Sequence, residues 1–288
     1  MRWRRAGWLV VLVGLALVGL AGCAGPSDEL SEAVAAGEEA SVPPISVASP
    51  FLAAVTRELV GETIPLLTLA EPGMCPGHFD LRPSQVRQAQ RCQVVVRFDF
   101  QQSLDARLTA TRGPSPTIAA VHVSGGMCEP QSYVEAGRQV ADALVAAGLL
   151  ARDAADERLV AVEQRMDALQ AWAREQIVSA GLDQVAVMAS RHQADFCRSL
   201  GLHVVATFPS VDESIPSEIN RAVQQGQKSG IAWVVANLPE GRQAADALAD
   251  RLSAQVVVFG NFPDGQGTDS FDRLVRDNVT SLVKAVPQ

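Results

Sequence analysis

The central stretch of the chain, positions 153–180, reads DAADERLVAVEQRMDALQAWAREQIVSA. Its apolar residues recur at steps of three and four, the spacing of an amphipathic helix: Leu159, Val162, Met166, Leu169, Ala173 and Ile177. Asp153 can cap the start of this helix, and Gly181 ends it. At 1.5 Å per residue the helix is about 42 Å long. A helix packed on one lobe is the alternative, but the length predicts a rod that spans two lobes.

Similar series of short apolar runs and amphipathic segments lie on both sides of this helix. The predicted strands are 45–48, 63–69, 92–98 and 117–122 before it, and 184–189, 203–208, 232–236 and 255–259 after it. The predicted helices are 50–60, 83–91, 100–110 and 130–147, then 191–200, 215–229, 240–253 and 268–285. Continuously apolar strands are typical of parallel sheets covered on both faces. The sequence therefore predicts an α/β protein with two Rossmann-like parallel-sheet lobes joined by one long rigid helix.

The first residues have the features of a targeting signal. Arg2, Arg4 and Arg5 precede an apolar run at 7–20, and LAGC at 20–23 resembles the lipobox of bacterial lipoproteins. We expect a signal peptide at 1–22 and a lipid on Cys23, which places the protein outside the cytoplasm; a plain signal peptide with an incidental cysteine is the alternative. The predicted organisation is then a flexible tether at 23–44, an N-terminal lobe at 45–152, a linking helix at 153–181 and a C-terminal lobe at 182–288.

Composition excludes several classes of protein. The 288 residues are 48% hydrophobic, which is too apolar for intrinsic disorder. There are 24 Lys and Arg against 32 Asp and Glu, a net charge of −8, and no basic cluster outside the N-terminus. We therefore expect no nucleic-acid partner.

Histidines and cysteines gather where strands of the predicted sheets end. Cys75 and His78 follow the strand 63–69, His122 and Cys128 follow 117–122, and His192 follows 184–189. Ligands of open parallel sheets bind beyond these carboxyl ends. Imidazole and thiolate from two lobes suit a divalent transition metal, zinc above all.

Some of these residues have a structural alternative. Cys75 and Cys128 could form a disulfide outside the cytoplasm, and each histidine could be a hydrogen-bonded cleft residue. Cys92 and His203 begin strands at the opposite end of the sheets, and Cys197 shares an apolar helical face, so we expect these three to be structural.

Four stretches resemble one known family. They are GHFDLRPSQV at 77–86, FDFQQSLDARL at 98–108, MCEPQSYVEAGRQVADAL at 127–144 and SRHQADFCRSLGLHVVATF at 190–208. They are similar to the zinc/manganese-type (cluster A-I) metal-binding lipoproteins that serve bacterial ABC importers. The resemblance implies a monomeric, lipid-anchored binding protein, not an enzyme, that captures zinc, or manganese or another divalent metal, between its lobes. It would deliver the metal to a membrane permease driven by an ATPase subunit.

The chain departs from the family at the ligand positions. Held in register, the family's ligands fall on Gly77, Gly125, Ser190 and either Gly260 or Asn261. One explanation is a site rebuilt from neighbours, in which Cys75, His78, Cys128 and His192 bind the metal. The other is that the glycines make room for a larger ligand, such as a metal chelate. The sequence favours the first.

A metal-dependent hydrolase is the competing class of function. It needs an open metal position and a base, for which Asp80, Glu129 and Asp195 are candidates. No nucleophile elbow, phosphate-binding loop or dinucleotide-binding glycine motif occurs in the chain, so binding is the better prediction.

Overall fold

The computed structural model describes residues 42–71, 81–111, 113–213, 215–264 and 267–286, and the statements below concern these residues. Residues from Val42 onward form one compact unit that contains two parallel sheets. Cys23, Cys75, His78 and Asp80 lie outside the described residues. Within the described ranges, none of the helices has the length and apolar character needed to cross a membrane.

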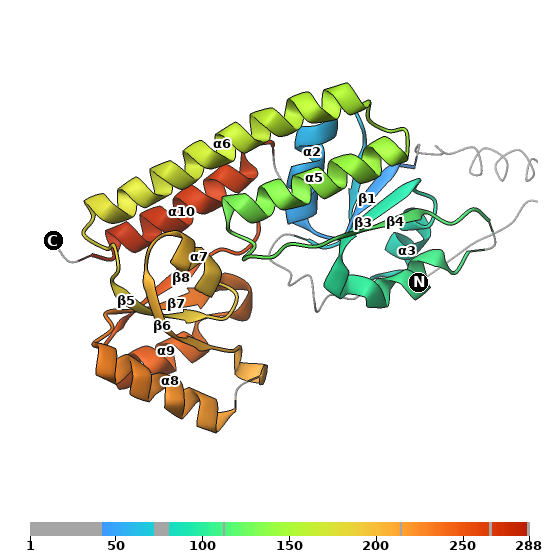
Figure 1. The fold of residues 1–288 in the computed structure, drawn as a ribbon. Helices are drawn as coiled ribbons and strands as arrows, with labels where there is room; N and C mark the ends of the chain where they lie inside the picture. Colours follow the sequence, from blue (N-terminus) through green and yellow to red (C-terminus); the bar gives the residue numbers. More distant parts are fainter. Residues whose placement is uncertain (1–41, 72–80, 112, 214, 265–266, 287–288) are drawn as a thin grey trace, which may run out of the picture. The chain divides into compact units, whose positions relative to one another are not determined.

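The N-terminal lobe is built on a four-stranded sheet in the order β2-β1-β3-β4 (Figure 1). Every neighbouring pair in it is parallel. Its strands are β1 (Ile45–Val47), β2 (Leu66–Thr68), β3 (Val94–Phe98) and β4 (Thr117–Val121). Its helices are α2 (Pro50–Val60), α3 (Pro83–Ala89), the 3₁₀ helix η1 (Asp99–Leu104), α4 (Asp105–Thr109) and α5 (Pro130–Ala146).

The C-terminal lobe repeats this arrangement, with the strand order β6-β5-β7-β8. Its strands are β5 (Ala186–Ser190), β6 (His203–Phe208), β7 (Trp233–Asn237) and β8 (Gln255–Phe259), all parallel. Its helices are α7 (Ala194–Ser199), α8 (Pro216–Ser229), α9 (Gln243–Leu252) and α10 (Ser270–Lys284). Two short 3₁₀ helices, η2 (Val211–Glu213) and η3 (Leu238–Glu240), follow β6 and β7. The predicted α/β fold with two parallel-sheet lobes is confirmed.

The helix α6 (Arg152–Ser179) joins the lobes, as predicted. It packs against α5 and α2 of the N-terminal lobe and against α10 of the C-terminal lobe (Figure 1). Its buried face carries Ala155, Val162, Met166, Leu169, Ala173 and Ile177, so the periodicity identified the correct face. The predicted cap was wrong, because Ala151 is the N-cap and Asp153 lies in the first turn. Gly181 follows the helix with a φ of 69°, a conformation that glycine adopts without strain.

All eight strands form where the sequence predicted them, with ends shifted by up to three residues. The predicted helix 100–110 is instead divided into η1 and α4. Gln101 lies inside η1, and its backbone there leaves the helical region at φ −91° and ψ 20°. Its side chain accepts a hydrogen bond of 2.9 Å from the Phe98 amide and so stabilises the turn at the end of β3.

The two lobes share one hydrophobic core that runs from Ile45 to Leu282. Tyr133 of α5 stacks on Phe271 of α10 with ring centroids 4.2 Å apart, and Phe51 of α2 meets the same ring edge-on at 5.8 Å. Such aromatic pairs contribute about 0.5–1.5 kcal/mol each beyond their buried area. Helix α10 therefore belongs to the C-terminal lobe in sequence but packs into the N-terminal lobe as well.

A buried ion network lies beside these rings. Arg165 of α6 donates to Glu58 of α2 at 2.6 Å and approaches Asp272 of α10 at 3.1 Å. The hydroxyl of Tyr133 donates to the same Glu58 carboxylate. One guanidinium thus connects the linking helix to a carboxylate from each lobe.

Candidate metal site

His192, one of the predicted ligands, lies beside a carboxylate at the carboxyl end of the C-terminal sheet. Its Nε2 is 3.2 Å from Oε1 of Glu240. The other oxygen of Glu240 accepts a 2.8 Å hydrogen bond from Ser190, the last residue of β5. The imidazole is about half exposed, while Glu240 is 16% exposed, so the carboxylate is held and the histidine faces solvent. This pair supplies one nitrogen and one oxygen donor of the kinds that bind zinc.

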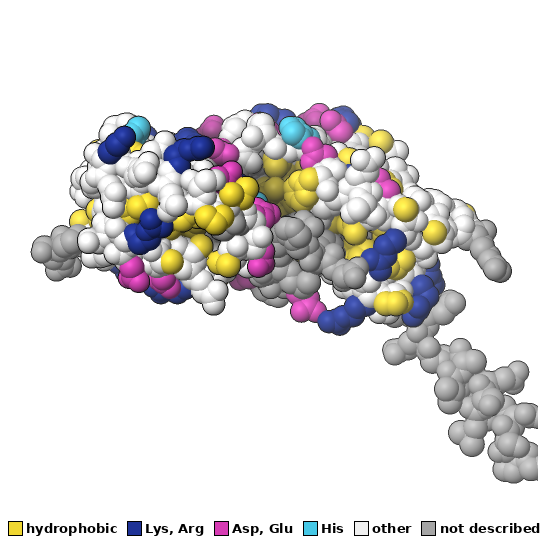
Figure 2. All heavy atoms as spheres, turned by 90° about the horizontal axis from the view of Figure 1, so that it is seen from below, with side chains coloured by type: hydrophobic (Ala, Val, Ile, Leu, Met, Phe, Trp, Pro, Cys, Tyr) yellow, Lys and Arg dark blue, Asp and Glu magenta, His cyan; other side chains and the backbone are white. Residues whose placement is uncertain are grey.

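The His192 and Glu240 pair borders a cavity of about 470 Å³. Asp212 and Glu213 of η2 also line it. Arg191 lies 3.8 Å from Glu213 and thus offsets part of the negative charge. In Figure 2 the middle of the face is hollowed, and Asp and Glu side chains gather along its flank. The electrostatic character of this region favours a cation.

Glu240 was absent from the predicted ligand set. It follows β7, which pairs directly with β5 in the same sheet. The rule that identified His192 applies equally to Glu240, because both residues follow the carboxyl ends of adjacent parallel strands. Extending that rule from histidine and cysteine to carboxylates would have found it.

Cys128, the other described ligand candidate, is completely buried. Its thiol donates to the carbonyl oxygen of Gly260 at 3.1 Å, and the amide nitrogen of Asn278 lies 3.7 Å from the sulfur. Burial raises the pKa of the Cys128 thiol well above its ordinary value. A metal binds the thiolate, so ligation by Cys128 requires loss of both the proton and the hydrogen bond to Gly260. Cys128 is a free thiol in the structure, and Cys75, its partner in the alternative disulfide, lies outside the described residues.

Neutral amides surround the family's fourth ligand position. The side-chain nitrogen of Gln193 donates toward Asn237 at 3.0 Å, Gly260 at 3.1 Å and Asn261 at 3.3 Å. Asn278 accepts from the Gly260 amide at 2.8 Å. The structure thus surrounds this position with a hydrogen-bonded cluster of amides.

The described glycines at family ligand positions do not open space for a larger molecule. A Cβ on Gly125 would lie 2.5 Å from a carboxylate oxygen of Glu129, and a Cβ on Gly260 would lie 2.7 Å from Leu274. The Glu129 carboxylate accepts a hydrogen bond from the Gly126 amide at 3.1 Å. Burial raises the pKa of Glu129 above its ordinary value. Protein atoms therefore occupy the volume that the alternative with a chelate would need at these two positions.

His122 forms a separate pair with Asp99. Both residues follow strands of the N-terminal sheet, and His122 Nδ1 lies 2.6 Å from Asp99 Oδ2. The hydrogen bond to His122 lowers the pKa of Asp99. A histidine that binds a metal through one ring nitrogen usually donates its other ring N–H to a carboxylate. The contact between His122 and Asp99 is of this kind. Among the described residues, however, no group of three or more His, Cys, Asp or Glu side chains is arranged to hold an ion.

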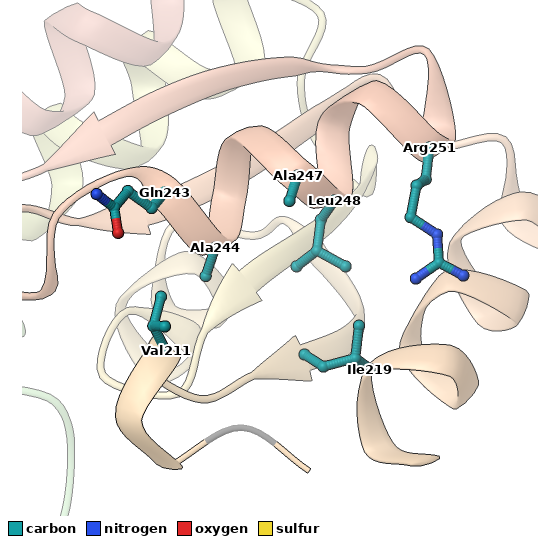
Figure 3. Close-up of a pocket in the computed structure, with 7 residues that line it drawn as sticks. All are labelled: Val211, Ile219, Gln243, Ala244, Ala247, Leu248 and Arg251. Atoms are coloured by element: carbon teal, nitrogen blue, oxygen red, sulfur yellow. The ribbon is translucent and has the colours of Figure 1, made fainter. Parts of the chain in front are cut away.

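An apolar cavity of about 330 Å³ lies next to the His192 region (Figure 3). Val211, Ile219, Ala244 and Leu248 line it between η2, α8 and α9, and Arg251 stands at one end. It contains no carboxylate, imidazole or thiol, so it has no metal-binding chemistry. Of the three residues expected to be structural, Cys92 and Cys197 are buried, while His203 lies exposed at the start of β6.

Solved structures with the same fold are metal-binding proteins. A point mutant of the periplasmic metal-binding protein from Candidatus Liberibacter asiaticus, bound to manganese, aligns with a TM-score of 0.70 and 14% identity, covering 84% of this chain and 99% of that one. A zinc-bound deletion mutant of ZnuA aligns with a TM-score of 0.68 and 15% identity, covering 85% and 98%. The binding protein FpvC of Pseudomonas aeruginosa with Ni²⁺ gives a TM-score of 0.69 and 14% identity, covering 84% and 96%. At these identities, the structures establish the shared fold.

A search of curated proteins gave no match. The family profile described as zinc-uptake complex component A, periplasmic (ZnuA), matches residues 45–285, which is most of the chain and both lobes. That span includes both sheets, the linking helix and the His192 region. The chain therefore belongs to the zinc-uptake complex component A family of periplasmic metal-binding proteins of ABC importers.

Proposed function

We propose that this protein is an extracytoplasmic lipoprotein that captures a divalent transition-metal ion, zinc in preference to manganese, and delivers it to an ABC permease and its ATPase subunit. The observation that carries the proposal is the contact between His192 and Glu240 on the wall of an acidic cavity at the carboxyl ends of β5 and β7. Membership of a metal-transport family supports binding over catalysis. Anchoring through a lipid on Cys23 is part of the proposal.

The proposed ligands come from both lobes. His192 and Glu240 supply a nitrogen and an oxygen from the C-terminal lobe. His78 and Cys75 complete the set from the segment that precedes α3 in sequence. Cys128 was also predicted as a ligand, but its buried thiol donates to Gly260, so we infer that Glu240 takes its place. Zinc is preferred because a thiolate from Cys75 would be a soft ligand.

The proposal is tested by titrating the full chain with Zn²⁺, Mn²⁺ and Ni²⁺ while thermal unfolding and binding heat are measured. A metal present at one hundred times its dissociation constant adds about 2.7 kcal/mol to the free energy of unfolding. We expect His192→Ala and Glu240→Gln each to weaken Zn²⁺ binding by at least about tenfold, since each removes or weakens one ligand. His203→Ala is the matched control, because His203 is an exposed histidine at the opposite end of the same sheet.

The N-terminal ligands are tested with His78→Ala and Cys75→Ser in the same titration. Loss of Zn²⁺ binding in these variants, but not in Cys128→Ser, supports the set with Glu240. Unchanged Zn²⁺ binding in the double variant His192→Ala/Glu240→Gln would show that the metal binds elsewhere. If none of the three metals shifts the unfolding of the wild type, a bare ion is not the cargo.

A further inference from the structure

A polar, positively charged pocket lies at the far edge of the N-terminal lobe, at the amino ends of its strands. Its volume is about 810 Å³, and none of the residues that line it is acidic. Arg87 and Arg91 supply its charge, and Gln93, Thr111 and Thr117 are among its polar residues. Gln93 precedes β3 and Thr117 begins β4, so the pocket lies away from the proposed metal site at the carboxyl ends.

The two arginines are exposed and have no ion pair among the described residues. Other arginines of this region have internal partners: Arg97 is bound to Asp105 at 2.5 Å, and Arg107 donates to the carbonyl of Leu81 at 2.6 Å. Arg82 lies 3.4 Å from Glu71. The guanidinium groups of Arg87 and Arg91 therefore remain available to an anion from outside the fold.

The positive charge is concentrated in this part of an otherwise acidic protein. Residues 81–128 contain six arginines and only two acidic residues, whereas the whole chain has a net charge of −8. Figure 2 shows Lys and Arg side chains close together at the N-terminal-lobe end of the face. A local positive field of this kind favours an anionic partner even where the net charge opposes it.

The pocket adjoins the place where the chain enters the fold. The carbonyl of Pro44 accepts hydrogen bonds from the amides of Gln93 at 2.8 Å and Val94 at 3.1 Å, and Gln93 lines the pocket. Cys23, where we predict the lipid, is only nineteen positions before Val42. Because the chain enters the fold beside the pocket, a lipid on Cys23 would keep the pocket within reach of the lipid headgroups.

We propose that the pocket lined by Arg87 and Arg91 binds the phosphodiester headgroups of anionic phospholipids. A guanidinium donates two parallel hydrogen bonds to a phosphate, which gives arginine an advantage over lysine at such a site. The contact holds the N-terminal lobe against the membrane and leaves the carboxyl ends of the strands, with the proposed metal site, facing elsewhere. It is independent of metal binding.

The experiment is cosedimentation with lipid vesicles. The protein is the chain from position 23 onward with Cys23→Ser, which keeps every described residue and has no lipid. Vesicles of phosphatidylcholine alone are compared with vesicles that contain about one third phosphatidylglycerol, at about 0.15 M salt. We expect binding to the anionic vesicles only, and a loss of roughly 25-fold in Arg87→Gln/Arg91→Gln, since each basic residue near a charged surface contributes about fivefold.

Arg221→Gln/Lys228→Gln is the matched control. It removes two exposed charges from α8 of the other lobe and should leave vesicle binding unchanged. Equal binding by the Arg87/Arg91 variant and the wild type, or no binding to anionic vesicles, overturns the proposal. Inorganic phosphate is added as a competitor, and displacement by millimolar phosphate would assign the pocket to the free anion instead. Circular dichroism of each variant checks that it is folded.

Discussion

The carboxylate of Glu129 occupies the space into which a side chain at Gly125 would project, with 2.5 Å between one of its oxygens and an ideal Cβ at Gly125. The two positions are four apart along the loop before α5. In this chain a neighbouring acid thus fills the space beside a position that the resemblance assigns to a family ligand.

Gly125→Ala should lower stability by about 1 kcal/mol, because the new methyl group displaces Glu129 from its hydrogen bond with the Gly126 amide. Glu129→Ala removes the same hydrogen bond. The double variant should therefore be no less stable than Glu129→Ala, and the two losses should not add. Urea unfolding of the four proteins measures this cycle. Additive losses would mean that Glu129 is not what fills the space.

The pH dependence of Glu129 can be derived from its environment. Burial raises the pKa of this carboxyl, so the folded state holds its proton more tightly than the unfolded state does. The wild type should then lose stability as pH rises from about 4.5 through the raised pKa, and Glu129→Gln should not. Relative to the wild type, the free energy of unfolding of Glu129→Gln should be higher by less than about 1 kcal/mol at neutral pH and no higher at lower pH. Glu157→Gln, on the exposed face of α6, is the control, because it also removes one negative charge. An equal gain in stability in this control would show that the effect does not come from the burial of Glu129.

Arg165→Met should destabilise the protein by about 3 kcal/mol at neutral pH, since it leaves the buried Glu58 carboxylate without its cation and removes one of the arginines that interact with Asp272. Burial already raises the pKa of Asp272, and loss of Arg165 should raise it further. The deficit should therefore shrink as pH falls and the carboxylates take up protons. Urea unfolding at about pH 7 and pH 5 tests this.

Arg138→Met is the control for Arg165. Arg138 pairs with Glu163 at 2.8 Å, but both side chains are more than one third exposed, so its loss should cost less than about 1 kcal/mol. Similar losses in the two variants would show that the network around Arg165 contributes no more than a surface pair.

Much of the fold could be predicted because its signals are local. The apolar spacing in α6 and the continuous apolar runs such as Val256–Val258 in β8 reflect patterns that the chain itself fixes. The kink at Gln101, inside η1, was not predictable in this way, because the Gln101 side chain accepts a hydrogen bond from the Phe98 amide at the end of β3. Helix caps such as Ala151, which has no side-chain hydrogen bond, give no signal either.

The candidate site could be predicted only in part. The rule that ligands bind beyond the carboxyl ends of parallel strands placed His192 at the observed edge of the sheet. It did not give the direction of any side chain. Cys128 follows the same rule and still points into the core, where Gly260 and Asn278 meet it from positions more than 130 residues away. Contacts so distant in sequence are a property of the packed fold. The roles of Cys75 and His78 stay predictions.

Thiol reactivity separates the two roles considered for Cys128. The described thiols are all buried, and burial raises the pKa of Cys92 to about 11 and that of Cys197 to about 12. Because the thiolate is the reactive form, Cys92, Cys128 and Cys197 should react slowly with an aromatic disulfide reagent at about pH 8 in the native protein, and rapidly in urea. Cys23→Ser removes the cysteine proposed to carry the lipid, and Cys75, a proposed ligand, is kept so that Zn²⁺ can still bind. Three results together would restore Cys128 as a metal ligand in place of Glu240. One thiol of the native protein would react at once, that fast reaction would be lost in Cys128→Ser, and Zn²⁺ would slow it. Slow reaction with and without Zn²⁺ is the result expected if the thiol keeps its hydrogen bond to Gly260 and the metal binds Glu240.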